Sequence, residues 1–133
     1  MTVIKWRDAY NTGIVQFDQE HHKLVALIDR MFFAIRDGSS KEITEQICAD
    51  ILAYTNYHFT NEEQAMRSAE YPDIDHHIGE HERLKTEAIK HQTTINRKFP
   101  EGRAEFYRLL REWLIQHIQN SDKKYGPYLT PSE

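Results

Sequence analysis

The sequence predicts an all-α protein, an up-down-up-down antiparallel four-helix bundle preceded by an N-terminal arm. Glycine and proline divide the chain into four stretches of roughly 20–30 residues, and in each stretch apolar residues recur at the 3.6-residue spacing of a helix. The connections between these stretches are short, which favours antiparallel neighbours. At 133 residues the chain is expected to form one domain, with the arm at 1–17 and the bundle at about 18–125.

The arm contains Trp6, is irregular, and is expected to lie across the bundle. The first helix is expected to begin with Asp18 as its N-cap and to run to Asp37, where Gly38 stops it. Its buried face is predicted to comprise His21, Leu24, Ile28, Met31, Phe32 and Ile35.

The second helix is predicted to open with a capping box over residues 39–42, Ser-Ser-Lys-Glu. Its buried face is predicted to comprise Ile43, Ile47, Ile51, Tyr54, His58 and Glu62. The third helix is expected to begin after Pro72 and to end near Pro100, and the fourth to run from about Arg103 to Asp122. Their buried faces are predicted to comprise His77, His81, Leu84, Ala88 and Ile95, then Phe106, Leu110, Trp113, Leu114, His117 and Ile118.

Composition excludes several classes of protein. The net charge is −4 and the sequence has no basic stripe, so nucleic-acid binding has no support. No apolar run approaches the ~20 residues of a membrane span, and the N-terminus lacks the apolar core of a signal peptide. The single cysteine, Cys48, rules out an intramolecular disulfide and a thiolate zinc site. We therefore expect a cytoplasmic monomer that does not insert into membranes.

Seven residues of the kinds that bind metals lie in four segments of the chain. They are His21, His58, Glu62, His77, His81, His117 and Asp122. Two pairs, His58 with Glu62 and His77 with His81, have i,i+4 spacing, so each pair projects from one helix face. In an antiparallel bundle the start of the first and third helices and the end of the second and fourth meet at one end. The seven side chains are therefore expected to converge there.

A single helical histidine is more often a core or surface residue than a metal ligand, so the prediction depends on this convergence. Buried together without an ion, these groups would leave many polar atoms unpaired, each at a cost of ~1–3 kcal/mol. His22, His76 and His91 are expected not to be ligands, and His21 is preferred to His22 because it shares a face with Leu24. Asp122 follows His117 by five residues, about 140° round an ideal helix. A π-type turn or a helix end is therefore required between the two residues.

The number of ligands favours two metal ions over one. Five imidazoles and two carboxylates suit a pair of octahedral irons that Glu62 and Asp122 both bridge, together with an oxo or hydroxo group. One iron then receives three histidines and the other two, which leaves a position open to an external ligand. The sequence has no Glu-x-x-His motif of the ferritin-like di-iron enzymes. A ligand set with few anions favours reversible oxygen uptake over hydroxylation.

Apolar residues within a turn of the ligands are expected to wall the open position and to exclude water from it. These predicted pocket residues are Leu24, Phe59, Trp113, Leu114 and Ile118.

The chain resembles the hemerythrin family, and specifically its single-domain bacterial members. The resemblance extends from about Trp6 to Tyr125, and its motifs are residues 17–21 with Leu24, residues 58–63, Tyr71, residues 77–81, and residues 113–118 with Asp122 and Tyr125. It implies two irons per chain, one held by His77, His81 and His117 and the other by His21 and His58. It implies that oxygen binds at the second, five-coordinate iron, without catalysed turnover, for transport, storage or delivery to an oxygen-consuming protein partner.

Two other classes of function stay open at this point. One is a sensor of oxygen, redox state or iron, which is less favoured because no signalling domain accompanies the bundle in this sequence. The other is a di-iron enzyme that acts on peroxide or nitric oxide. A site that holds zinc alone is the least favoured.

Overall fold

Four long helices make up most of the chain in the computed structural model, which describes residues 3–129. After a short 3-10 helix, η1 (Asp8–Tyr10), they are α1 (Val15–Arg36), α2 (Lys41–Ser68), α3 (Ile74–Arg97) and α4 (Arg103–His117). A π-helical turn, η2 (Ile118–Asp122), then leads into α5 (Lys123–Leu129). No strand occurs within residues 3–129. The predicted all-α four-helix bundle is confirmed.

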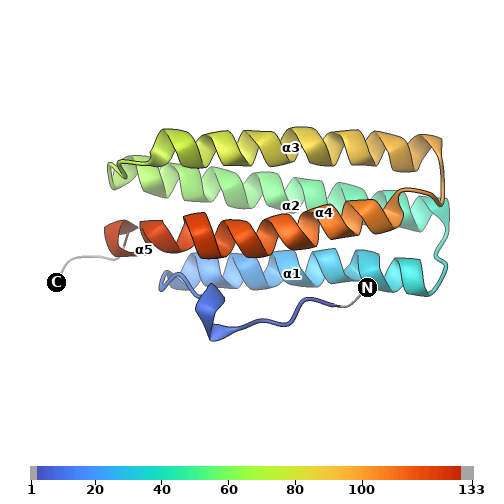
Figure 1. Cartoon of the computed structure of the whole chain (residues 1–133), viewed down its shortest axis with the longest axis horizontal. Coiled ribbons are helices and arrows are strands. Elements are labelled where there is room, and N and C mark those ends of the chain that lie inside the picture. Colours follow the sequence, from blue (N-terminus) through green and yellow to red (C-terminus); the bar gives the residue numbers. More distant parts are fainter. Residues whose placement is uncertain (1–2, 130–133) are drawn as a thin grey trace.

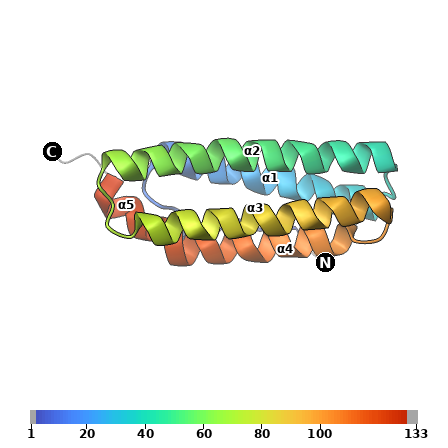
Figure 2. The same ribbon diagram turned by 90° about the horizontal axis from the view of Figure 1, so that it is seen from above.

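Successive helices run in opposite directions and lie side by side (Figure 1). Contacts join α1 to α2, α2 to α3, α3 to α4, and α4 back to α1, which closes the bundle. The start of α1, the end of α2, the start of α3 and α5 all lie at the same end of the bundle (Figure 2). Within the described part of the chain, no helix combines the length and apolarity needed to cross a membrane.

Two predicted helix starts are wrong by a few residues. Helix α1 begins at Val15 rather than after Asp18, and the Asp18 carboxylate instead accepts hydrogen bonds from Thr12 N and Oγ1 at 2.7 and 2.8 Å. In α2 the N-cap is Ser40, not Ser39, because it is the Ser40 hydroxyl that accepts from Ile43 N. In α2 two adjacent serines can act as the cap, whereas α1 starts at Val15 after Ile14, whose side chain forms no cap hydrogen bond.

The fourth helix does not stop at Asp122 as expected. Its α-helical part ends at His117, and the chain continues through the π-turn into α5. Of the two alternatives for bringing Asp122 toward His117, a π-type turn or a helix end, the structure has the first. The turn adds one residue to the helix without ending it.

The core runs along the bundle axis and is built from the predicted apolar faces, with one exception. Met31, Ile51 and Phe106 are fully buried. Ile43, predicted to be buried, is 53% exposed, and its neighbour Thr44 is buried in its place. The guanidinium of the largely buried Arg103 lies against Thr44, at 3.5 Å from its hydroxyl, and therefore favours a small polar residue there.

Candidate metal centre

All seven side chains that the sequence singles out meet at one end of the bundle. Helix α1 contributes His21, α2 contributes His58 and Glu62, α3 contributes His77 and His81, α4 contributes His117, and η2 contributes Asp122. Each is at most 4% exposed. They form two groups, and within each group the potential ligand atoms lie within 4.8 Å of one another.

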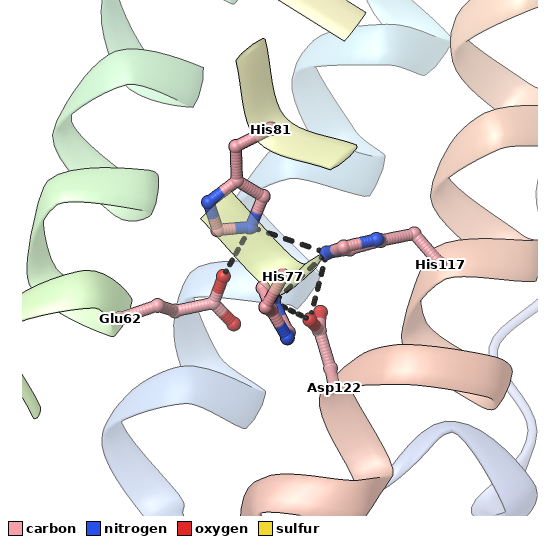
Figure 3. Close-up of side chains that lie close together, drawn as sticks. All are labelled: Glu62, His77, His81, His117 and Asp122. Carbon is pink, nitrogen blue, oxygen red and sulfur yellow. Dashed lines mark hydrogen bonds and ion pairs between the residues drawn. The ribbon is translucent and has the colours of Figure 1, made fainter. Parts of the chain in front are cut away.

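The first group joins three imidazoles from α3 and α4 (Figure 3). His117 Nε2 lies 3.1 Å from His77 Nε2 and 3.2 Å from His81 Nε2. Two perpendicular ligands at a metal–nitrogen distance of about 2.1 Å lie about 3.0 Å apart. The spacing of these nitrogens is therefore that of neighbouring ligands on one metal ion.

The second group joins His21 and His58. Their imidazole rings meet edge to face, with centroids 4.7 Å apart. His21 Nε2 lies 3.4 Å from a Glu62 oxygen, and His58 Nε2 lies 3.2 Å from the same oxygen. This group offers two nitrogen ligands where the first offers three.

The two carboxylates belong to both groups, and each divides its oxygens between them. Asp122 Oδ1 lies 2.9 Å from Nε2 of both His77 and His117, whereas Oδ2 lies 2.9 Å from His21 Nε2. Glu62 Oε1 faces His81 Nε2 at 3.3 Å, whereas Oε2 faces the second group. This is the arrangement of two carboxylates that bridge a pair of metal ions.

The polar atoms at the centre of the cluster fit a cation. Among residues 3–129, hydrogen-bond partners are lacking for Nε2 of His21 and His58, for Glu62 Oε1 and for both oxygens of Asp122. A buried polar atom without a partner costs ~1–3 kcal/mol. Positively charged ions between these atoms would satisfy all of them. The donors are imidazole nitrogens and carboxylate oxygens, which suit iron, zinc or copper.

The pKa values of the clustered imidazoles depend on the carboxylates beside them. Burial lowers the pKa of His21, but the adjacent carboxylates of Asp122 and Glu62 outweigh it and raise that pKa to about 10. Against the same effect of burial, Glu62 and Glu20 raise the pKa of His58 to about 9. Asp122 and Glu80 raise that of His117 to about 10. Without a metal, these imidazoles therefore hold protons at neutral pH, and a metal ion must displace them.

Behind three of the imidazoles lies a glutamate that accepts a hydrogen bond from Nδ1. Glu20 on α1 contacts His58 on α2 at 2.5 Å, and Glu63 on α2 contacts His81 on α3 at 2.8 Å. Glu80 on α3 contacts His117 on α4 at 2.6 Å.

These three contacts cross successive helix boundaries, so each helix holds the imidazole of the next. A proton on Nδ1 leaves the Nε2 lone pair directed at the centre of the cluster, as a metal ligand requires.

The three glutamates were missed by the sequence reasoning, although a signal was present. Glu20, Glu63 and Glu80 each directly precede or follow a predicted ligand in the sequence. A neighbouring residue lies about 100° round the helix and so at the edge of the buried face. From there its side chain reaches the next helix. Tyr125, which also donates a hydrogen bond to Glu62 Oε2 at 2.5 Å, had no such signal in its spacing.

Two of the five predicted apolar pocket residues, Phe59 and Trp113, lie against imidazoles of the first group. The Phe59 ring stacks on His81, with centroids 3.7 Å apart and planes 3° from parallel. The Trp113 ring stacks on His117, with centroids 4.2 Å apart. The other three predicted pocket residues, Leu24, Leu114 and Ile118, are buried in the same hydrophobic cluster as Phe59.

The histidines predicted not to be ligands lie outside the cluster. His22 is exposed and lies against Trp6 of the arm, with ring centroids 3.9 Å apart and ring planes tilted by 32°. His76 is 62% exposed, and its Nε2 contacts Glu80 at 2.8 Å. His91 lies on α3 and is not among the clustered side chains.

Comparison with known proteins gives one consistent result. Residues 12–129 match the family described as "Hemerythrin HHE cation binding domain". The chain is 30% identical over 135 residues to the bacteriohemerythrin of Methylococcus capsulatus, which covers 98% of this chain and 99% of that protein. It is 26% identical over 121 residues to the myohemerythrin of Theromyzon tessulatum, which covers 91% of this chain and 89% of that protein.

The fold is shared with a solved structure as well. A crystal structure of wild-type hemerythrin superposes with a TM-score of 0.90 over 98% of this chain and 100% of the other, at 24% identity. The bundle, its buried cluster of histidines and carboxylates, and a family match over most of the chain agree. The chain belongs to the hemerythrin family of cation-binding proteins.

Proposed function

We propose that this protein binds dioxygen reversibly at a centre of two irons, and that it transports, stores or delivers oxygen. The observation that carries this proposal is the division of each carboxylate between two groups of imidazoles. A single ion would leave one of the two groups without a metal. Membership of the hemerythrin family, whose bacterial relatives share nearly the full length of the chain, supports iron and oxygen as the metal and the ligand.

The proposed ligands follow from the two groups. His77, His81 and His117 would hold one iron, His21 and His58 would hold the other, and Glu62 and Asp122 would bridge them. These residues would give the first iron three imidazoles and the second only two. The position left for dioxygen would therefore be on the side of His21 and His58. When bound, the irons supply the two electrons that dioxygen takes up.

The surrounding residues hold the ligands and keep water away. The Nδ1 contacts to Glu20, Glu63 and Glu80 fix the orientation of three imidazoles. The rings of Phe59 and Trp113 shield His81 and His117. On the side of His21 and His58, where the open position would lie, both imidazoles are at most 1% exposed, and exclusion of water there would favour reversible binding over turnover.

The test is to load the protein with iron, reduce it without oxygen, and record its visible spectrum while oxygen is added and then removed. We expect two irons per chain and an absorption band that appears with oxygen and disappears under argon over repeated cycles. One zinc per chain, or a spectrum that never reverses, would contradict the proposal. Rapid turnover of peroxide or nitric oxide would favour the enzyme instead.

A matched pair of variants tests the ligands. His21→Ala should lower the iron content and abolish the reversible band, because the second group would keep only His58. His22→Ala, at the adjacent exposed position, should retain both. Equal iron content in the two variants would remove His21 from the proposed ligand set.

A further inference from the structure

Glu80 contacts two elements of the chain besides its own helix, α4 and η2, whereas Glu20 and Glu63 do not contact η2 in the structure as described. Its Oε2 accepts hydrogen bonds from His117 Nδ1 at 2.6 Å and from the Ser121 hydroxyl at 2.7 Å. Its Oε1 lies 2.8 Å from Nε2 of His76, one turn earlier on α3. A single carboxylate on α3 therefore contacts both the last residue of α4 and the π-turn.

The other two glutamates have no contact of this kind with the π-turn in the structure as described. Glu63 contacts His81 Nδ1. Glu20 contacts His58, Gln16 and Asn61, all on α1 or α2. Glu63 is therefore a natural comparison for Glu80, because it makes the same carboxylate–imidazole contact and lacks the second one.

The π-turn decides where Asp122 points. In a regular α-helix Asp122 would lie about 140° from His117, whereas the wider π-turn brings the two nearly into line. Their side chains do meet, with His117 Nε2 at 2.9 Å from Asp122 Oδ1. Contacts with other helices hold this turn: Asp122 lies 2.9 Å from both His21 and His77. Ser121, the residue before Asp122, adds the hydrogen bond to Glu80.

We infer that Glu80 is a positioning residue that fixes the His117 imidazole and the π-turn together, and so sets the relative placement of His117 and Asp122. One carboxylate oxygen accepts from both side chains, so a shift of either disturbs the other. The consequence for metal binding rests on the proposed function. The stabilisation of the π-turn rests on the hydrogen bonds alone.

The test uses iron-loaded protein and two measurements, amide hydrogen exchange of residues 118–122 and the rate of iron transfer to a chelator. Glu80→Ala should speed exchange in the π-turn about tenfold, because local opening becomes easier without the Ser121 contact. It should also weaken iron binding roughly 10- to 100-fold, as is usual when the partner of a metal-bound histidine is lost.

Three further variants separate the two roles. Ser121→Ala should speed exchange in residues 118–122 and speed iron transfer less than Glu80→Ala does, because His117 keeps its contact with Glu80. Glu63→Ala should speed iron transfer and leave exchange in residues 118–122 unchanged. Glu80→Gln, whose amide oxygen still accepts hydrogen bonds, should restore much of both properties. If Glu80→Ala does not fold, Glu80→Gln and Ser121→Ala carry the test on exchange.

The inference is overturned if Glu80→Ala exchanges in residues 118–122 at the wild-type rate, or if Glu63→Ala speeds that exchange equally. Failure of the proposed function would look different. Wild-type protein would then bind zinc instead of iron or show no reversible oxygen spectrum, and the exchange comparison, made on the metal-free protein, would still decide whether Glu80 holds the π-turn.

Discussion

At the scale of single residues, the chain places charge and hydrocarbon on different sides of the same imidazoles. His117 has Glu80 at Nδ1 and the Trp113 ring on its face. His81 has Glu63 at Nδ1 and the Phe59 ring on its face. Each ring is thus held by one directional contact and one stacking contact. Together these contacts favour the orientation in which Nε2 faces the centre of the cluster, which would preorganise the imidazole for a metal ion.

Leu114 provides a prediction at this scale. It is 3% exposed and lies on α4, one turn before Ile118 in the buried cluster. In Leu114→Ala the space left by the side chain should admit water near the centre and speed autoxidation of the oxygenated protein. The rate of autoxidation, followed by the visible spectrum, measures this.

The matched control is Leu110→Ala. Leu110 is equally buried and lies one turn further from His117 on the same helix. Both substitutions should lower the free energy of unfolding, by about 2–5 kcal/mol, but only the change at Leu114 should speed autoxidation. An autoxidation rate equal to that of wild type would remove Leu114 from the proposed pocket.

At the scale of elements, the π-turn is the feature on which the cluster most depends. The pairs His58/Glu62 and His77/His81 have i,i+4 spacing, which regular α-helices align. His117 and Asp122 have one residue more between them, and η2 absorbs that residue. The turn is therefore equivalent to a one-residue insertion into an otherwise regular helix.

This equivalence predicts the effect of deleting one residue. Removal of the exposed Gln119 should restore i,i+4 spacing between the histidine and the aspartate, about 40° apart on an α-helix. The shortened protein should keep the iron content of the unmodified protein. Removal of the exposed Gln116 should instead rotate His117 by about 100° relative to the rest of α4 and lose iron.

Iron content and helical circular dichroism of the two deletion variants test this prediction. A folded Gln119 deletion without iron would show that the π-turn does more than restore the phase of the helix. Retention of iron by the Gln116 deletion would show that α4 can shift along the bundle to compensate.

At the scale of the whole molecule, stability and metal binding are coupled through pH. In the metal-free protein the carboxylates raise the pKa of His21 and His117 to about 10 and that of His58 to about 9, against the lowering effect of burial. A group with a raised pKa adds stability that is complete below its ordinary value of 6.5 and is lost as the pH rises through the raised value.

The metal-free protein should therefore lose stability between about pH 6.5 and 10. Glu62 and Asp122 act in the opposite sense, because nearby imidazoles hold their pKa values well below the ordinary range despite burial. Their contribution is present above about pH 4 and is lost in acid. Stability should be highest between these two limits.

Urea unfolding at pH 6 and pH 9 measures this, with the iron-loaded protein as the comparison. Metal-bound imidazoles carry no added proton, so iron should be retained better at pH 9 than at pH 6. A metal-free protein that is more stable at pH 9 than at pH 6 would contradict the charge assignment in the cluster.

Much of this protein is determined by local sequence pattern. The four helices follow from apolar residues at 3.6-residue spacing, and the choice of His21 over His22 follows from the face shared with Leu24. The meeting of the seven side chains at one end follows from antiparallel order alone. The five-residue spacing between His117 and Asp122 even showed where a regular helix could not continue. The spacing of apolar residues is a property of each helix by itself, so the sequence alone is enough to predict it.

Only the tertiary structure decided how the helices are rotated against one another. That rotation divides the oxygens of Glu62 and Asp122 between two groups of imidazoles. It also pairs each of the three glutamates with the imidazole of the next helix and leaves Ile43 exposed while Thr44 is buried. A contact between two helices depends on how both are packed. The spacing of residues along one helix therefore cannot predict it.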